Sequence, residues 1–224
     1  LSCAFRSDLY LREVTSKRKA RHMWGRTDRA GAIAALIVLA SAASAQATTA
    51  EATASSSSFV ASERYIQERV PTLAPMGYVL FCAKNPVHCG LQDEVTALPT
   101  LTAQHLDTLR SVNVEINSSI NQQNDRTIGA IKDEWQIARS AGDCEDFVLA
   151  KRARLLQIGW PAGTLRIAVA RTPTGEGHAV LVVRTAAGDI VLDNRNNAIL
   201  PWQHANLRWV KIQSGSNPRR WFKI

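Results

Sequence analysis

The chain has 224 residues, of which 46% are apolar and 21% are charged, as is typical of a soluble globular protein. This composition excludes a wholly disordered chain, a coiled coil and a polytopic membrane protein, and four Cys are too few for a small disulfide scaffold. The formal net charge is +8, but residues 1–45 hold eight Lys and Arg against three Asp and Glu. The rest has only a mild basic excess, so the charge does not indicate a nucleic-acid partner.

The N-terminal region has the pattern of a secretory signal peptide. After Met23, a short basic stretch precedes the apolar run 30–39 and small residues that end at Ala45. The run is shorter and less apolar than a membrane span, so we expect cleavage before Gln46 and no stable membrane span afterwards. We interpret residues 1–45 as a mis-assigned N-terminal extension plus signal peptide, with a genuine basic extension as the alternative. A periplasmic or secreted protein is expected.

The rest of the chain has the length of one domain. Residues 46–58 are small and polar and predict a disordered leader, which leaves 59–224 as the folded domain. The Pro- and Gly-rich stretch 71–90 predicts irregular structure with a short strand at Tyr78–Phe81. Apolar residues between positions 101 and 120 recur near helical spacing and predict one long amphipathic helix.

A second helix and several strands follow. The helix is expected to begin after Gly142, with Asp143 as its N-cap, and to end at Gly159. The predicted strands are Leu165–Ala170, His178–Arg184, Ile190–Asp193, Leu207–Gln213 and Trp221–Phe222. Helices followed by an antiparallel sheet indicate an α+β fold.

Cys144 falls in the first turn of the second helix. Backbone N–H groups and the helix dipole stabilise a thiolate there, and a thiolate is a competent nucleophile for acyl chemistry. The alternative is a small buried residue that fills space beside the helix.

His178 and Asp193 lie on consecutive strands that a short turn can join as a hairpin. A crude register places Asp193 opposite Leu181, so a bulge or a small register shift is needed to bring the carboxylate to the imidazole. A His held by a carboxylate and facing a thiolate is the general-base arrangement of nucleophilic catalysis. The alternatives are a strand-edge His178 bonded to a backbone carbonyl and an Asp193 that only forms a turn.

These motifs resemble a known family. The resemblance is carried by GDCEDFVLAKRARL, GEGHAVLVVRTAAGDIVLDN and the trailing Trp221, and by PMGYVLFCAKNPVHC and VNVEINSSIN upstream. In these segments, the mature chain resembles the bacterial transglutaminase-like cysteine proteinases. This family includes LapG-like periplasmic cysteine proteases that release surface adhesins. The resemblance implies a papain-like, transglutaminase-like fold, with helices packed on an antiparallel sheet. It also implies Cys144 as nucleophile, His178 as base and Asp193 as the orienting residue.

The same resemblance implies a calcium site that uses Asp143 and Glu145. With Asp146, these residues place three hard oxygen donors within four positions, which suits Ca²⁺. The alternative is that Asp143 caps the helix while the other two carboxylates complement its dipole.

Two further Cys lie outside this motif. Cys82 and Cys89 predict a disulfide in an oxidising compartment, with a zinc site that includes His88, or a free buried pair, as alternatives. Other side chains are given structural roles. We expect His105 and His204 at the surface, Trp135, Trp160, Trp202, Trp209 and Trp221 as core anchors, and Lys151–Arg154 and Arg219–Arg220 as solvated basic faces.

The expected function is therefore that of a secreted or periplasmic cysteine endopeptidase with a Cys-His-Asp triad and calcium as its expected cofactor. The expected substrate is a cell-envelope or adhesin protein, which the family resemblance alone implies. Two alternatives remain open: an acyl-transferring, transglutaminase-type enzyme, and a catalytically silent binding module of the same fold. The first shares the acyl-enzyme and differs only in the acceptor, whereas the second would be marked by a missing triad residue.

Overall fold

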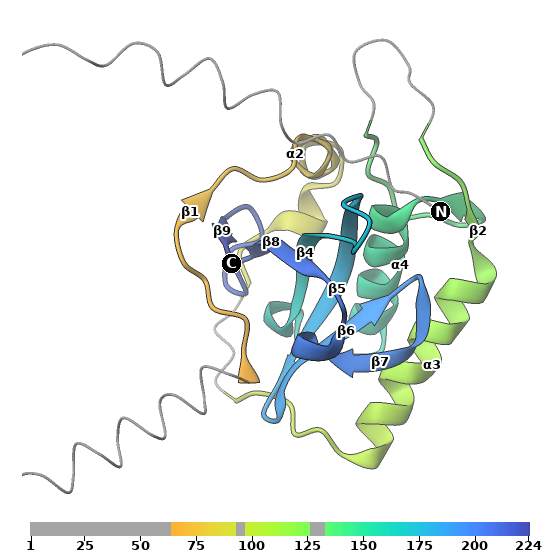
Figure 1. The fold of residues 1–224 in the computed structure, drawn as a ribbon, viewed down its shortest axis with the longest axis vertical. Helices are drawn as coiled ribbons and strands as arrows, with labels where there is room; N and C mark the ends of the chain where they lie inside the picture. Colours follow the sequence, from red (N-terminus) through yellow and green to blue (C-terminus); the bar gives the residue numbers. More distant parts are fainter. Residues whose placement is uncertain (1–63, 93–96, 126–132) are drawn as a thin grey trace, which may run out of the picture. The chain divides into compact units, whose positions relative to one another are not determined.

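The computed structural model describes residues 64–92, 97–125 and 133–224 (Figure 1). The expected extension, signal peptide and leader all lie outside these residues. Within the described part of the chain, no helix is long and apolar enough to cross a membrane.

A seven-stranded antiparallel sheet forms the centre, in the order β1-β9-β8-β4-β5-β6-β7. Its strands are β1 (Pro71–Thr72), β4 (Leu165–Arg171), β5 (Gly177–Thr185), β6 (Gly188–Asp193), β7 (Asn196–Pro201), β8 (Arg208–Gln213) and β9 (Trp221–Lys223). A small parallel pair joins β2 (Asn121–Gln122) to β3 (Ala141–Gly142), directly before the second long helix.

In the described part of the chain, three α-helices accompany the sheet: α2 (Met76–Lys84), α3 (Ala103–Ser119) and α4 (Cys144–Gln157). Single 3₁₀ turns are formed by η1 (Pro86–Cys89), η2 (Ala162–Thr164) and η3 (Trp202–His204). Helices α3 and α4 pack against each other, α4 lies along β5, and α3 contacts β7 (Figure 1). The predicted α+β fold, with helices packed on an antiparallel sheet, is confirmed.

Both faces of the central strands are buried. In β5, Ala179 and Leu181 belong to the main core with the helices, whereas Val180 and Val182 belong to a second cluster that contains Ile66. Because neither face meets water, these strands are continuous apolar runs instead of alternating ones.

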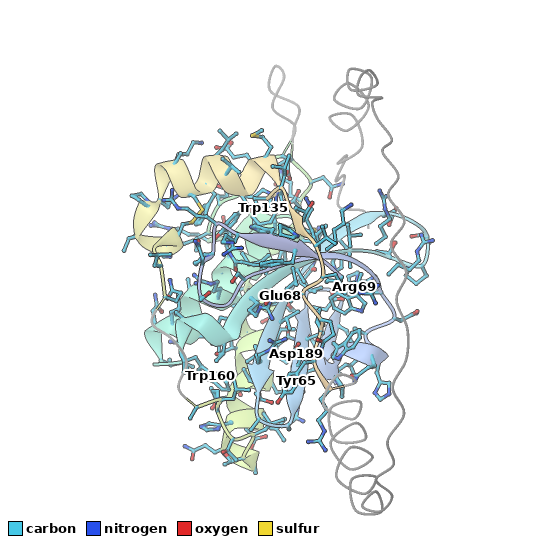
Figure 2. All side chains as sticks on the ribbon, turned by 90° about the vertical axis from the view of Figure 1, so that its left-hand side faces the viewer. Tyr65, Glu68, Arg69, Trp135, Trp160 and Asp189 are labelled. Carbon is cyan, nitrogen blue, oxygen red and sulfur yellow. A yellow bond between two sulfur atoms is a disulfide. The ribbon has the colours of Figure 1, made fainter. Side chains whose placement is uncertain are left out.

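The segment that precedes β1 is tied to the edge of this second cluster. The Ile66 N–H donates to Asp189 Oδ2 over 2.8 Å, and Arg166 in β4 pairs with Glu68. Figure 2 shows Tyr65 and Glu68 beside Asp189 on this side of the sheet. The ion pair with Glu68, whose side chain is 30% exposed, helps to explain why a charged Arg166 is tolerated at 1% exposure.

The expected strand at Tyr78–Phe81 is wrong, because these residues lie inside α2. Tyr78, Phe81 and Cys82 follow a helical spacing and are the buried side chains of this helix, whereas Val79 is exposed. The neighbouring prediction is confirmed: a Cys82–Cys89 disulfide links α2 to η1, with the two Cα atoms 5.6 Å apart.

The basic stretch Lys151–Arg154 is not a solvated face. Lys151 is 0% exposed and Arg152 is 4% exposed, because α4 lies between α3 and the sheet and has little surface to offer. The stretch Arg219–Arg220 is exposed as expected. Of the five Trp residues that the structure describes, Trp135, Trp160 and Trp221 are buried, and Trp202 and Trp209 are partly buried.

Candidate active site

Cys144 is the first residue of α4 and is completely buried. The backbone N–H of Ala179 in β5 donates to its Sγ over 3.3 Å. The start of α4 is thereby docked against the start of β5, one residue after His178. The predicted nucleophile and the predicted base are brought to the same end of the helix and strand.

His178 and Asp193 make direct contact. His178 Nε2 lies 2.8 Å from Asp193 Oδ1, and both side chains are buried. The β5–β6 ladder pairs Leu181 with Leu192, so its continuation places Asp193 two residues from the position opposite His178. Such diagonal neighbours are within reach of long side chains.

The expected bulge between β5 and β6 is therefore not present. The two strands pair regularly up to Thr185 and Gly188, which leaves a two-residue turn. The register shift lies on the other side of β6, where β6 pairs with β7 between Val191 and Asp193. The ladder is instead shifted by one residue from the crude register, since its continuation places Asp193 opposite Val180 and not Leu181. This small shift, which was one of the two expected alternatives, puts Asp193 on the same face of the sheet as His178.

Arg195 is a site residue that the sequence did not single out. It follows Asp193 in the β6–β7 turn; its Nη2 donates to Asp193 Oδ2 over 2.8 Å and its backbone N–H donates to Oδ1 over 2.9 Å. Burial opposes ionisation of Asp193, but the hydrogen bonds from His178 and Arg195 outweigh it and hold the pKa of this carboxyl well below its usual value. Asp193 is thus a fixed anion behind the imidazole.

Helix α3 holds the same turn from its other side. The amide of Asn117 donates to the Asp193 carbonyl over 3.1 Å, and the amide of Asn113 donates to the Asn196 carbonyl over 2.8 Å. The two Asn are four residues apart and share one face of the helix. The position of Asp193 therefore depends on α3 as well as on the sheet.

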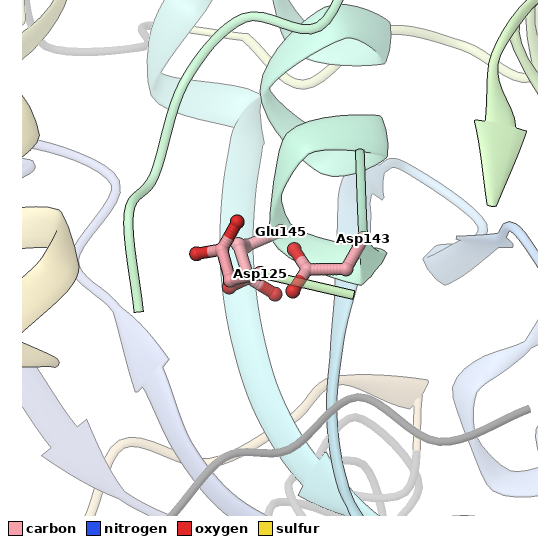
Figure 3. A group of neighbouring side chains, drawn as sticks. All are labelled: Asp125, Asp143 and Glu145. Atoms are coloured by element: carbon pink, nitrogen blue, oxygen red, sulfur yellow. The ribbon is translucent and has the colours of Figure 1, made fainter. Parts of the chain in front are cut away.

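A group of carboxylates surrounds the start of α4. One ligand oxygen from each of Asp125, Asp143 and Glu145 lies within 4.8 Å of the others, and Figure 3 shows the three side chains converging. The two expected metal ligands are thus brought together, and Asp125 joins them from a polar loop 18 residues upstream of Asp143. No local motif connects the two positions, so the sequence alone could not reveal this third residue.

Burial and mutual repulsion disfavour the ionised form of these carboxylates in the absence of a cation. Burial raises the pKa of Asp143 to about 6, with the nearby charge of Asp125 acting in the same direction. Burial and hydrogen bonding with Asp133, together with the charge of Asp143, raise the pKa of Glu145 well above its usual value. A divalent cation would relieve the same repulsion without protons, and an all-oxygen set suits Ca²⁺.

Asp143 occupies the N-cap position but does not cap the helix through its side chain. Its Oδ1 is buried and has no hydrogen-bond partner among the described residues. The expected capping role of the Asp143 side chain is wrong. Its carboxylate lies instead beside those of Asp125 and Glu145. Asp146 has a different role, because its Oδ1 accepts from the Gln136 N–H over 2.8 Å and ties the preceding loop to α4.

Glu145 links the carboxylate group to the sulfur. Its Oε2 lies 3.1 Å from Cys144 Sγ. An ionised Glu145 at this distance would oppose a thiolate, so anything that draws charge from this carboxylate favours the nucleophile.

A cavity of about 330 Å³ adjoins Asp193. Asp193 and Arg195 form part of its wall, with an apolar contribution from Val191, Leu200 and Ala205. The cavity therefore reaches Asp193 and Arg195, whereas His178 and Cys144 do not line it.

The chain is similar to a known family and to solved structures. The family model for bacterial transglutaminase-like cysteine proteinases matches residues 68–224. The chain is also similar to solved structures of LapG from Legionella pneumophila. The EGTA-treated form is 31% identical, with 47% of this chain and 61% of that chain covered and a TM-score of 0.41. The calcium-bound form is 28% identical, with 52% and 67% covered and a TM-score of 0.45. In the first of these matches, the chain thus spans about three fifths of the length of its relative. No curated protein matches the chain.

Proposed function

The chain belongs to the bacterial transglutaminase-like cysteine proteinases, and from this premise we propose that it is a cysteine endopeptidase with Cys144, His178 and Asp193 as its triad. The observation that carries the proposal is the contact of His178 Nε2 with an anionic Asp193, beside the docked Cys144. With Nε2 committed to the carboxylate, Nδ1 is the ring nitrogen that exchanges protons with the sulfur.

In the proposed reaction, the Cys144 sulfur attacks the scissile carbonyl carbon and forms the C–S bond, while His178 takes the thiol proton. Backbone N–H groups at the start of α4 stabilise the oxyanion of the tetrahedral intermediate. The C–N bond then breaks as His178 gives its proton to the leaving amine. Water, deprotonated by His178, attacks the thioester, and the C–S bond breaks to release the acid and the thiol.

We further propose that Asp125, Asp143 and Glu145 contribute to a calcium site. The orphaned Oδ1 of Asp143 and the converging carboxylates support it. Bound Ca²⁺ would neutralise these carboxylates, including the one next to Cys144 Sγ. LapG from Legionella pneumophila has been solved in calcium-bound and EGTA-treated forms.

The proposed location is the periplasm or the outside of the cell, and the proposed substrate is a cell-envelope or adhesin protein. The Cys82–Cys89 disulfide is in keeping with an oxidising compartment. The protein substrate follows from the family, whereas the adhesin class is the finer part of this proposal.

The test uses the mature chain and an envelope extract. Cys144→Ser and His178→Ala should abolish cleavage while the melting temperature stays close to that of the wild type, and His105→Ala on α3 serves as the matched histidine control. A Cys144→Ala variant should retain the substrate in a pull-down. Cleavage that survives Cys144→Ser would refute the assignment of the nucleophile.

Product masses separate hydrolysis from acyl transfer. Hydrolysis adds one water to the cleaved bond, whereas transfer to a supplied amine gives an amide of that amine. An amide as the main product at millimolar amine would favour the transglutaminase-type alternative over the proposed endopeptidase.

A further inference from the structure

The edge of the sheet formed by β8, β9 and β1 carries a concentration of positive charge (Figure 1). Residues 69–84 and 194–224, which contain these strands and α2, hold eight Lys and Arg and no Asp or Glu. Lys84 and Arg195 pair with carboxylates from other segments. The remaining six cations form no ion pair with another described residue, so this edge favours an anionic partner.

Lys211 and Lys223 are direct partners on neighbouring strands. The β8–β9 ladder places them opposite each other, and like charges in this position destabilise a sheet. Lys223 is exposed, whereas Lys211 is partly buried and its Nζ donates to the Leu73 carbonyl over 2.9 Å. Burial lowers the pKa of Lys211, and no carboxylate among the described residues opposes the shift. An anion beside the two ammonium groups would remove their repulsion.

This basic pair lies on the face of the sheet that carries the proposed nucleophile. Ala179 pairs with Val169, Val169 pairs with Lys211, and Lys211 pairs with Lys223. Residues paired in this way project to the same face, and Ala179 and Val169 share the main core with Cys144. Neighbouring strands are about 4.8 Å apart, so the two Lys lie about 10 and 14 Å from Ala179. The N–H of Ala179 is the one that donates to Cys144 Sγ.

Exposed aliphatic side chains surround the basic pair. Leu73, whose carbonyl binds Lys211, is exposed, and so is Met76 at the start of α2. On the other side, the Lys223 N–H donates to the carbonyl of the exposed Val70 over 2.8 Å. Two cations bordered by aliphatic groups match a peptide in which acidic and apolar residues are close together.

We propose that Lys211 and Lys223 form a subsite for an acidic segment of the protein substrate. The inference rests on the proposed function, because it names a substrate class for that reaction. An extended peptide advances about 3.3 Å per residue, so distances of about 10 and 14 Å correspond to acidic residues about three to five positions from the scissile bond. Leu73 and Val70 contact the apolar residues beside them.

The binding experiment uses acetyl-hexaglutamate amide as the probe and acetyl-hexaglutamine amide as its neutral counterpart. The mature chain with Cys144→Ala is titrated with each peptide, with Ca²⁺ present throughout, and the backbone amides of Lys211 and Lys223 are followed by ¹H–¹⁵N NMR. We expect saturable shifts with the glutamate peptide only, and weaker binding as salt is added. In Lys223→Met, binding should weaken about fivefold to tenfold.

Lys84→Met is the matched control, because it removes an exposed Lys whose charge is already paired with Glu134. It should bind the glutamate peptide like the wild type, and so should Lys223→Arg, which keeps the charge. Equal shifts with both peptides, or binding that Lys223→Met leaves unchanged, would overturn the inference.

The cleavage assay separates substrate binding from chemistry. In peptides that span the cleaved bond of the captured substrate, replacing the acidic residues three to five positions from the bond by their amides should raise KM and leave kcat unchanged. In a variant with both Lys211→Met and Lys223→Met, the same replacement should have little effect, because the partner charges are gone. If this variant does not fold, the exposed Lys223→Met decides alone. A KM increase that persists in the variant that folds would contradict the subsite.

Two further outcomes are distinct. If no substrate is cleaved, the proposed function fails, but the NMR titration still decides whether the basic pair binds an acidic peptide. Vesicles of phosphatidylglycerol and phosphatidylcholine test a lipid surface as the occupant instead. Vesicle binding that Lys223→Met abolishes, without binding of the glutamate peptide, would overturn the inference.

Discussion

At the scale of single residues, Asp193 connects the sheet, the β6–β7 turn and the proposed base His178. It accepts from His178 on β5 and from Arg195 in the turn, and its own carbonyl accepts from Asn117 on α3. Since each donor comes from a different part of the fold, the carboxylate has little freedom to turn. The imidazole is oriented as a consequence, which is what a general base needs.

We expect Arg195→Met to lower kcat and to destabilise the protein at neutral pH. The pKa of Asp193 is depressed in the folded protein, so its stabilisation is present above the usual carboxyl pKa and is lost as the pH falls through and below it. The difference in melting temperature between wild type and Arg195→Met should therefore be largest above pH 5 and shrink on acidification. Arg208→Met, an exposed substitution on β8, provides the control. A difference that does not change with pH would show that Arg195 acts only by packing.

The residues of the proposed triad could be singled out from the sequence because each occupies a position with its own local signal. Cys144 follows a Gly-Asp pair at a helix start, and His178 and Asp193 lie at the ends of adjacent apolar strands. Arg195 and Asp125 could not, because Arg195 is an ordinary turn residue in sequence and Asp125 reaches the site only through tertiary folding. Lys151 was misjudged for the same reason: an amphipathic pattern does not reveal that α3 covers the other face of α4.

At the scale of elements, the entry of the chain into α4 decides the position of Cys144. Strand β3 ends at Gly142, and a Cβ at this position would overlap the Asp146 carboxylate. Asp146 in turn accepts from the Gln136 N–H, so glycine permits the close approach that fixes the loop to the helix. The β2–β3 pair is followed closely by the first turn of α4, where Cys144 lies.

We expect Gly142→Ala to lower the melting temperature and to reduce cleavage, because the Asp146 side chain must move to admit the methyl group. Gly90→Ala is the matched control, since a Cβ there meets nothing within 4 Å. Differential scanning calorimetry and the cleavage assay give the two readouts. Equal melting temperatures for the two variants would contradict the role given to the close approach.

The long helices and the main strands were predicted from the sequence, whereas α2 was mistaken for a strand and some short or polar strands were missed. Helices α3 and α4 and strands β4, β5 and β6 have strong periodic or apolar signals. Strand β7 was missed, because it is polar at its start and exposed at the edge of the sheet. The α2 segment was mistaken for a strand, because a nine-residue helix offers barely two turns of periodicity and is rich in β-type residues such as Tyr, Val and Phe.

At the scale of the whole molecule, the carboxylate group joins two parts of the chain that are distant in sequence. Asp125 follows α3 and β2, whereas Asp143 and Glu145 open α4. The Glu134 N–H donates to Asp125, so the loop after the undescribed residues 126–132 is attached to the same point. A cation bound here would couple α3, this loop and α4 into one unit.

Calcium should therefore stabilise the folded chain as well as support cleavage. A ligand that binds only the native state raises the free energy of unfolding by about 2.7 kcal/mol at a concentration one hundred times its Kd, which corresponds to a rise of several degrees in melting temperature. EGTA should remove this increment, and Mg²⁺ should restore little of it, because Mg²⁺ requires a tighter octahedral shell. The ligand variants test the same site.

In Asp143→Asn and Asp125→Asn, the rise in melting temperature on adding calcium should be small at the same calcium concentration. Asp107→Asn changes an exposed carboxylate on α3 and should respond to calcium like the wild type. Since Asp143 makes no side-chain cap, the cost of its substitution should appear only when calcium is present. Equal melting temperatures with calcium and with EGTA in the wild type would refute the calcium site and leave the proposed triad untouched.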